Sequence, residues 1–66
     1  MDATSQAKVM AFGFRIIRRE DSPSIRIKEK VIGQKQGWRT IRKFASKAQR
    51  DKEFELLLRD QMTISD

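Results

Sequence analysis

Hydrophobic and cationic side chains alternate along residues 24–32, the clearest pattern in the chain. A β-strand directs successive side chains to opposite faces. One face of this segment carries Glu29 and three apolar side chains: Ile25, Ile27 and Val31. The opposite face carries three cations in succession: Arg26, Lys28 and Lys30. Like charges that neighbour one another on one face repel, so this strand indicates a polyanionic partner.

A second strand is predicted over residues 9–19, where apolar and aromatic residues recur at alternate positions. Its apolar stripe consists of Met10, Phe12, Phe14 and Ile16. Gly13 interrupts the strand and indicates a bulge or a close backbone approach. Residues 20–24 contain Asp, Ser and Pro and predict the turn of an antiparallel hairpin between the two strands.

Residues 33–37 place a polar trio between two glycines and predict a second hairpin loop. The segment that follows, residues 38–45, fits the apolar pattern of a strand and also that of a helix. Gly37 suits entry from a hairpin, and Ser46 is a start signal that would be wasted inside a helix. Both residues favour the strand.

A C-terminal helix is predicted over residues 47–62, which contain neither glycine nor proline. Ser46 and Gln49 fit a capping box at its beginning. Its apolar stripe recurs at helical spacing and would face the sheet: Phe54, Leu57, Leu58 and Met62.

Together these elements predict an α+β fold of order β-β-β-α, a three-stranded antiparallel meander packed against one C-terminal helix. The chain then divides into a disordered leader (1–8), a single small α+β domain (9–62) and a tail (63–66). The predicted core contains the apolar residues of both stripes together with Ile25, Ile27, Val31 and Phe44. This order of elements resembles small sheet-reading DNA-binding domains, such as the arm-binding N-terminal domains of phage-type integrases, and small single-strand binders with a basic sheet.

Composition narrows the classes of function. The 66 residues include no His and no Cys, which removes the usual nucleophile–base pairs and the commonest metal ligands, so we expect neither an enzyme, a metal nor a cofactor. No apolar run approaches the ~20 residues of a membrane helix, and we expect a cytoplasmic protein of bacterial or phage origin without membrane contact. The formal net charge of +6 is typical of a nucleic-acid binder.

The sequence therefore predicts a non-enzymatic nucleic-acid-binding module, with DNA favoured over RNA, that uses the exposed face of its sheet. The predicted binding residues are Arg15, Arg19, Arg26, Lys28, Lys30, Lys35, Trp38, Arg39 and Lys43. Three alternatives stay open. The first is a small phage- or plasmid-type interaction factor that docks on an acidic protein, and the second is a solvated surface without a ligand. The third is a small ribonuclease toxin that uses only Arg, Lys and Glu, although no catalytic set stands out. Trp38 fits base stacking but also packing in the core or at a sheet edge. A homodimer is compatible with so small a core.

Overall fold

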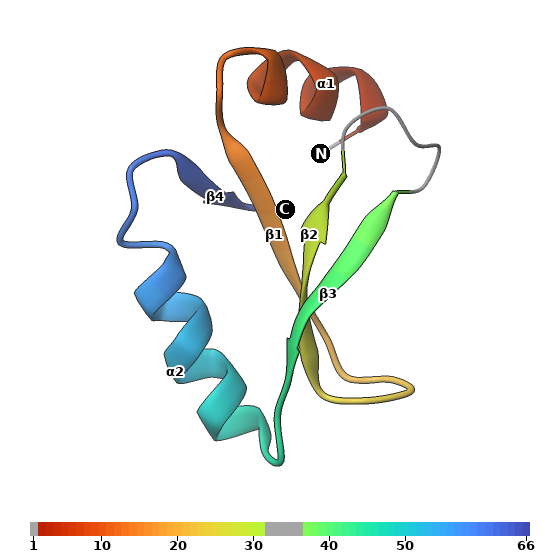
Figure 1. Cartoon of the computed structure of the whole chain (residues 1–66), viewed down its shortest axis with the longest axis vertical. Coiled ribbons are helices and arrows are strands. Elements are labelled where there is room, and N and C mark those ends of the chain that lie inside the picture. The colour runs from red at the N-terminus through yellow and green to blue at the C-terminus, as the bar shows by residue number, and fades with distance from the viewer. Residues whose placement is uncertain (1, 32–36) are drawn as a thin grey trace.

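A computed structural model describes residues 2–31 and 37–66 of the chain (Figure 1). The elements in chain order are α1 (Ala3–Ala11), β1 (Arg15–Glu20), β2 (Arg26–Lys30), β3 (Trp38–Lys43), α2 (Lys47–Leu57) and β4 (Thr63–Ser65). The α+β class is confirmed. The order β-β-β-α is wrong, because a helix precedes the three strands and a fourth strand follows α2.

Helix α1 occupies residues that the sequence assigned to a leader and to the beginning of a strand. Its N-cap is Asp2, whose side-chain oxygen accepts a hydrogen bond of 2.7 Å from the backbone N–H of Ser5. This bond satisfies one of the N–H groups that a helix leaves unpaired at its start. The strand expected from residue 9 therefore begins only at Arg15.

Gly13 ends α1 and does not form the β-bulge that the sequence predicted. Its φ of +93° lies in the left-handed region that favours glycine, directly after the C-cap residue Phe12. The N–H of Gly13 donates to the carbonyl of Met10 at 3.0 Å, and the N–H of Phe14 donates to that of Val9 at 3.1 Å. This bond pair is a Schellman motif, which turns the chain from the helix into β1.

The four strands form one sheet in the order β3-β2-β1-β4. The β1–β2 and β2–β3 pairs are antiparallel, as the sequence predicted, and segment 38–43 is a strand rather than a helix. The predicted hairpin loop at 33–37 lies outside the described residues except for Gly37, whose carbonyl accepts from Val31 at 2.6 Å. Strand β4 pairs with β1 in parallel, Arg15 beside Thr63, so the expected tail is part of the sheet.

Helix α2 packs against one face of the sheet and forms the core with it. The predicted cap is confirmed, because the Ser46 hydroxyl accepts from the N–H of Gln49 at 3.2 Å. The helix ends at Leu57, not at residue 62. Ile17, Ile27 and Phe54 are buried at the centre of the core, with Phe44, Leu57 and Leu58 packed around them.

Two residues of the predicted core lie at the surface instead. Phe12 is 78% exposed, because it follows the last turn of α1 and does not belong to a strand. Met62 is 42% exposed, because α2 ends before it and the chain turns there into β4. Ile16 is fully buried as expected, but it lies on the face opposite α2, at the end of the sheet where α1 packs against β1.

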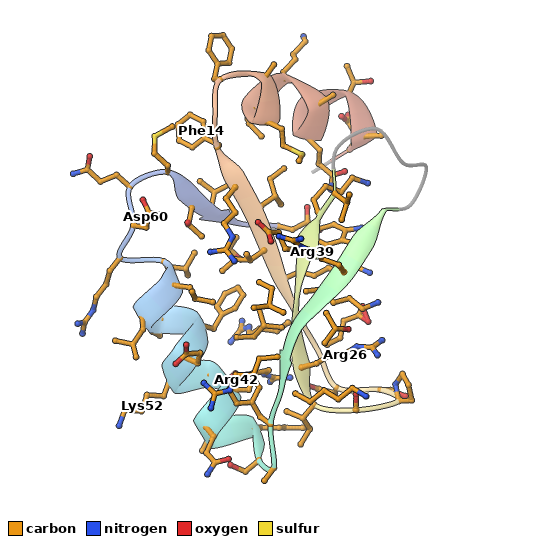
Figure 2. The ribbon with its side chains drawn as sticks, in the orientation of Figure 1. Phe14, Arg26, Arg39, Arg42, Lys52 and Asp60 are labelled. Carbon is orange, nitrogen blue, oxygen red and sulfur yellow. The ribbon has the colours of Figure 1, made fainter. Side chains whose placement is uncertain are left out.

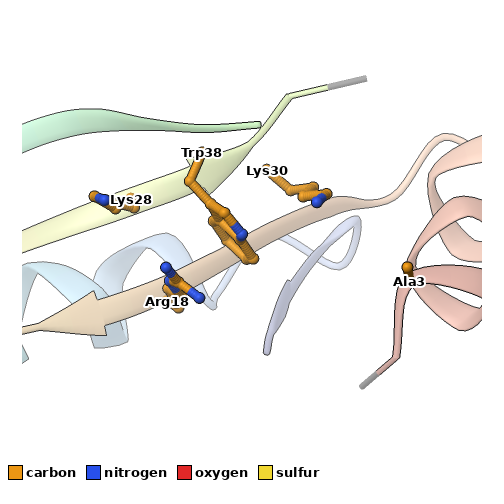
Figure 3. Close-up of a pocket in the computed structure, with 5 residues that line it drawn as sticks. All are labelled: Ala3, Arg18, Lys28, Lys30 and Trp38. Atoms are coloured by element: carbon orange, nitrogen blue, oxygen red, sulfur yellow. The ribbon is translucent and has the colours of Figure 1, made fainter. Parts of the chain in front are cut away.

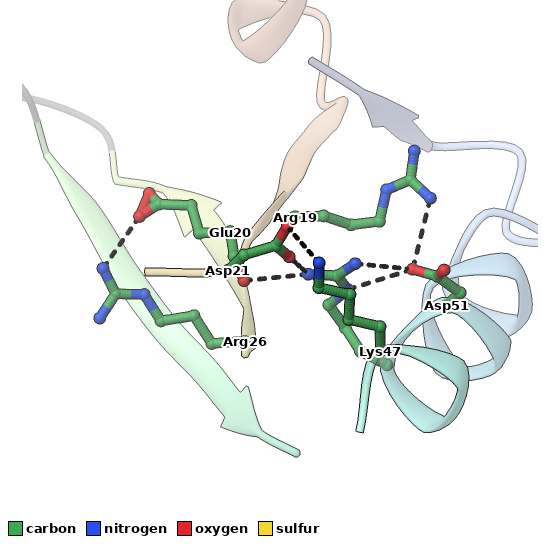
Figure 4. Close-up of polar contacts among 7 residues, drawn as sticks. Arg19, Glu20, Asp21, Arg26, Lys47 and Asp51 are labelled. Atoms are coloured by element: carbon green, nitrogen blue, oxygen red, sulfur yellow. Dashed lines mark hydrogen bonds and ion pairs between the residues drawn. The ribbon is translucent and has the colours of Figure 1, made fainter. Parts of the chain in front are cut away.

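Arg50 fastens α2 to the turn between β1 and β2. Its guanidinium is buried, donates to the backbone carbonyl of Glu20 at 3.0 Å and pairs with the carboxylates of Asp21 and Asp51. Figure 4 labels these two carboxylates, one beside the β1–β2 turn and the other on α2. The carboxylates raise the pKa of Arg50, and the hydrogen bond from Arg50 holds the pKa of Asp21 below its usual value. The positive charge of Arg50 is thus held where α2 meets the β1–β2 hairpin.

Candidate nucleic-acid interface

Strand register decides which side chains share the face opposite α2. Residues directly across from one another in neighbouring strands point to the same side of a sheet. Arg18 lies across from Lys28, Glu20 from Arg26, and Lys30 from Trp38. We call this side the cationic face, and its residues are Ile16, Arg18, Glu20, Arg26, Lys28, Lys30, Trp38, Thr40 and Lys43.

The structure brings together five of the nine predicted binding residues on the cationic face: Arg26, Lys28, Lys30, Trp38 and Lys43. Placing Arg15, Arg19 and Arg39 on this face is wrong. Arg19 lies across from Ile27 and Arg39 from Glu29 on the α2 side, and Arg15 shares that side because it is two residues from Ile17 on β1. Lys35 lies outside the described residues. Arg18, which is not among the predicted residues, stands in the middle of the face.

Three cations on the α2 side of the sheet are held by carboxylates, and a fourth, Arg42, lies over the ring of Phe44. Glu29 accepts from Arg15 at 2.6 Å and from Arg39 at 2.8 Å, and Asp51 pairs with Arg19 at 3.4 Å. Partial burial opposes ionisation of Glu29, yet the hydrogen bonds from Arg39 and Arg15 hold its pKa below the usual value. The guanidinium of Arg19 also lies 4.9 Å from the ring centre of Phe54, so this cation belongs to the packing of α2.

Glu20 is the one carboxylate among the residues that define the cationic face. It pairs with Arg18 and Arg26, each at 2.9 Å, and with Lys28 at 3.4 Å. The hydrogen bond from Arg26, with further help from Lys28 and Arg18, lowers the pKa of Glu20 to about 2. One negative charge is therefore shared by three cations, and the face keeps a positive excess.

The ion pairs of Glu20 predict an acid-sensitive contribution to stability. The pKa of Glu20 falls from an ordinary 4.5 to about 2 on folding, so the contribution is complete above pH 4.5 and is lost as the pH falls toward 2. We expect Glu20→Gln to lose less stability than the wild type on acidification from roughly pH 6 to pH 3. Urea unfolding at both pH values measures the difference, and equal losses in the two proteins would contradict it. Asp21 and Glu29 keep part of the acid response in both proteins.

A pocket opens on the cationic face between the sheet and the start of α1 (Figure 3). It encloses about 530 Å³ and is lined by Ala3, Arg18, Lys28, Lys30 and Trp38. In Figure 3 the lining side chains of β1, β2 and β3 stand in front of the sheet, while α2 lies behind it. The volume falls within the ~300–1,000 Å³ of small-molecule sites in proteins.

Trp38 is the aromatic wall of this pocket. The guanidinium carbon of Arg18 lies 4.1 Å from the centre of its ring, and the ammonium of Lys30 lies 5.5 Å from it. Both are cation–π distances. The indole is half-buried, faces away from the α2 core and packs against Arg18 and Lys30 on the outer strand β3.

Other kinds of site are not formed by the described residues. No group of three or more Asp and Glu side chains in residues 2–31 and 37–66 could hold a metal ion. Neither α1 nor α2 is long and apolar enough to cross a membrane.

Comparison of the chain with protein-family models, with curated proteins and with solved structures gave no match.

Proposed function

We propose that this protein binds nucleic acid through its cationic face. The observation that carries the proposal is the charge on that face, where five cations accompany a single carboxylate. The cations are Arg18, Arg26, Lys28, Lys30 and Lys43. A polyanion laid across the sheet would relieve the repulsion among them and release its condensed counterions.

The spacing of the strands supports a polyanion over a single small anion. Neighbouring strands lie ~4.8 Å apart, and residues two apart along a strand are separated by ~6.6 Å. Arg18, Lys28 and Lys30 are placed in this way by β1 and β2. Cations repeated at such intervals suit a ligand whose charges also repeat, as the phosphates of a nucleic-acid backbone do.

The partial burial of two cationic side chains also supports binding to nucleic acid. The side chains of Arg26 and Lys28 are only 14% and 19% exposed, so their aliphatic stems lie along the sheet. Fewer conformations are lost when such side chains engage a ligand. Lys43, at the outer strand, is exposed and has no ion-pair partner among residues 2–31 and 37–66.

If the cationic face binds nucleic acid, the affinity should depend on the salt concentration and should fall when two of its lysines are replaced by glutamate. We expect a logarithmic salt slope of about −3 to −4 for a labelled oligonucleotide, since four to five phosphates would be neutralised. Lys30→Glu combined with Lys43→Glu should lower the affinity about 10-fold or more and make the slope shallower by about 2. Fluorescence polarisation over a salt series measures both quantities.

The matched control is Lys52→Glu combined with Arg59→Glu, which changes the net charge equally. Both residues are exposed, and Lys52 projects from α2 away from the cationic face (Figure 2). The control pair should keep most of the wild-type affinity. Equal losses of affinity in both pairs would mean that only the net charge of the protein matters. A wild type whose binding has no salt slope would refute nucleic-acid binding, and an acidic protein would then be the partner to seek.

A further inference from the structure

We infer that the pocket beside Trp38 receives an unpaired base, so that the ligand of the cationic face is single-stranded nucleic acid. This inference rests on the proposed function and specifies its ligand. It starts from the position of the indole, which stands in a pocket among three cations rather than in the core.

The pocket has the chemistry that an exposed base requires. Bases splayed from a strand stack on aromatic rings or on the plane of an arginine guanidinium. Here the two planes already lie against each other, with the guanidinium of Arg18 4.1 Å from the Trp38 ring centre, so a base would stack on the outer side of this pair. Ala3 supplies the wall on the side of α1, and its small side chain leaves space for a flat ligand (Figure 3).

The positive charges around the pocket fit the phosphate backbone of a nucleic-acid strand that would carry such a base. Lys28 and Lys30 line the same pocket, two residues apart on β2. With a base stacked at Trp38, the phosphates on either side of it would lie within reach of these two ammonium groups. Stacking and phosphate contact would then be made together, as in proteins that follow a single strand without reading its sequence.

A duplex can use only part of this surface. Its bases are stacked and paired, so their faces are closed to Trp38, and only its phosphates would meet the cations. Stacking of one base is worth a factor of about 10 to 100 in affinity. Single strands should therefore bind more tightly than duplexes of the same length by roughly this factor.

The emission of Trp38 tests the inference in the unmodified protein. The chain contains one Trp and no Tyr, so its tryptophan fluorescence reports on the pocket alone. We expect a single-stranded DNA 12-mer to quench this emission, while an abasic 12-mer with the same phosphates leaves it nearly unchanged. The abasic strand should also bind about 10-fold or more weakly than the 12-mer with bases.

Substitution of the indole gives the second readout. Trp38→Ala should remove the preference for the base-containing strand but keep the salt slope, and Trp38→Phe should keep part of the preference. Far-UV circular dichroism checks that both variants are folded, and the quenching experiment needs neither of them.

The failures of the two proposals are distinguishable. If the duplex, the abasic strand and the single strand bind equally, with a salt slope that Lys30→Glu and Lys43→Glu reduce, the pocket assignment is wrong and nucleic-acid binding stands. Unchanged Trp38 emission at saturating single strand would also overturn the assignment. If none of the three ligands binds with a salt slope, the proposed function is refuted as well.

Discussion

Replacement of Phe54 by alanine is expected to lower the free energy of unfolding by ~3–5 kcal/mol. Phe54 is 3% exposed and packs with Ile17 and Ile27 at the centre of the core. Removing the ring leaves a cavity between α2 and the sheet that neighbouring side chains fill only in part. A domain of 66 residues has ~3–10 kcal/mol of stability, so the substitution would remove about a third of it or more.

Phe12→Ala is the matched control, because the same ring is removed at a position that is 78% exposed. We expect it to change stability by less than ~0.5 kcal/mol. Urea unfolding followed by circular dichroism compares the two variants, and Phe54→Leu provides a milder change if the alanine variant does not fold. Equal costs at positions 12 and 54 would contradict the placement of the core beneath α2.

Replacement of Arg50 by methionine is expected to cost ~1.5–3 kcal/mol, the range for hydrogen bonds that involve charged groups. Arg50 is 5% exposed and joins α2 to the β1–β2 turn through the carbonyl of Glu20 and the carboxylate of Asp21. Methionine retains much of the apolar stem but makes none of these bonds. The loss is smaller than for a fully buried ion pair, because Asp21 and Asp51 are half exposed and water can solvate them.

Arg59→Met serves as the control for charge and composition, since Arg59 is exposed just beyond the end of α2. Its stability should stay within ~0.5 kcal/mol of the wild type. Thermal and urea unfolding of both variants at the same pH provide the comparison. An Arg50→Met protein as stable as the wild type would show that apolar packing alone docks the helix.

The sequence predicted only part of the cationic face because the pattern of β1 does not show which of its residues point to which face of the sheet. Residues 16–19 read Ile-Ile-Arg-Arg, and a shift by one residue exchanges one isoleucine and one arginine for others of the same kind. Such a shift moves every side chain to the opposite face, so this strand alone does not define its own register. Both isoleucines are buried, Ile17 under α2 and Ile16 at the α1 end.

The elements with a clear local signal were predicted well. The cap at Ser46, the strand at 38–43 and the cations of β2 follow from residue types and spacing within a few positions. Helix α1 was missed because Gly13 was read as part of a strand. A cap signal at Asp2, three alanines one turn apart and a glycine after the last turn together point to a short helix. Parallel pairing of β4 with β1 joins distant parts of the chain and leaves no local signal.

The two outer strands of the sheet also bear on self-assembly. Strand β3 carries Arg39, Arg42 and Lys43, and its pairing with β2 is interrupted by a bulge opposite Ile27 and Lys28. Strand β4 has three residues. Charges, bulges and short length each discourage a further strand from adding to an open edge. If several molecules of the protein bound side by side on one polyanion, their β3 and β4 edges would therefore not pair into a continuous sheet that aggregates.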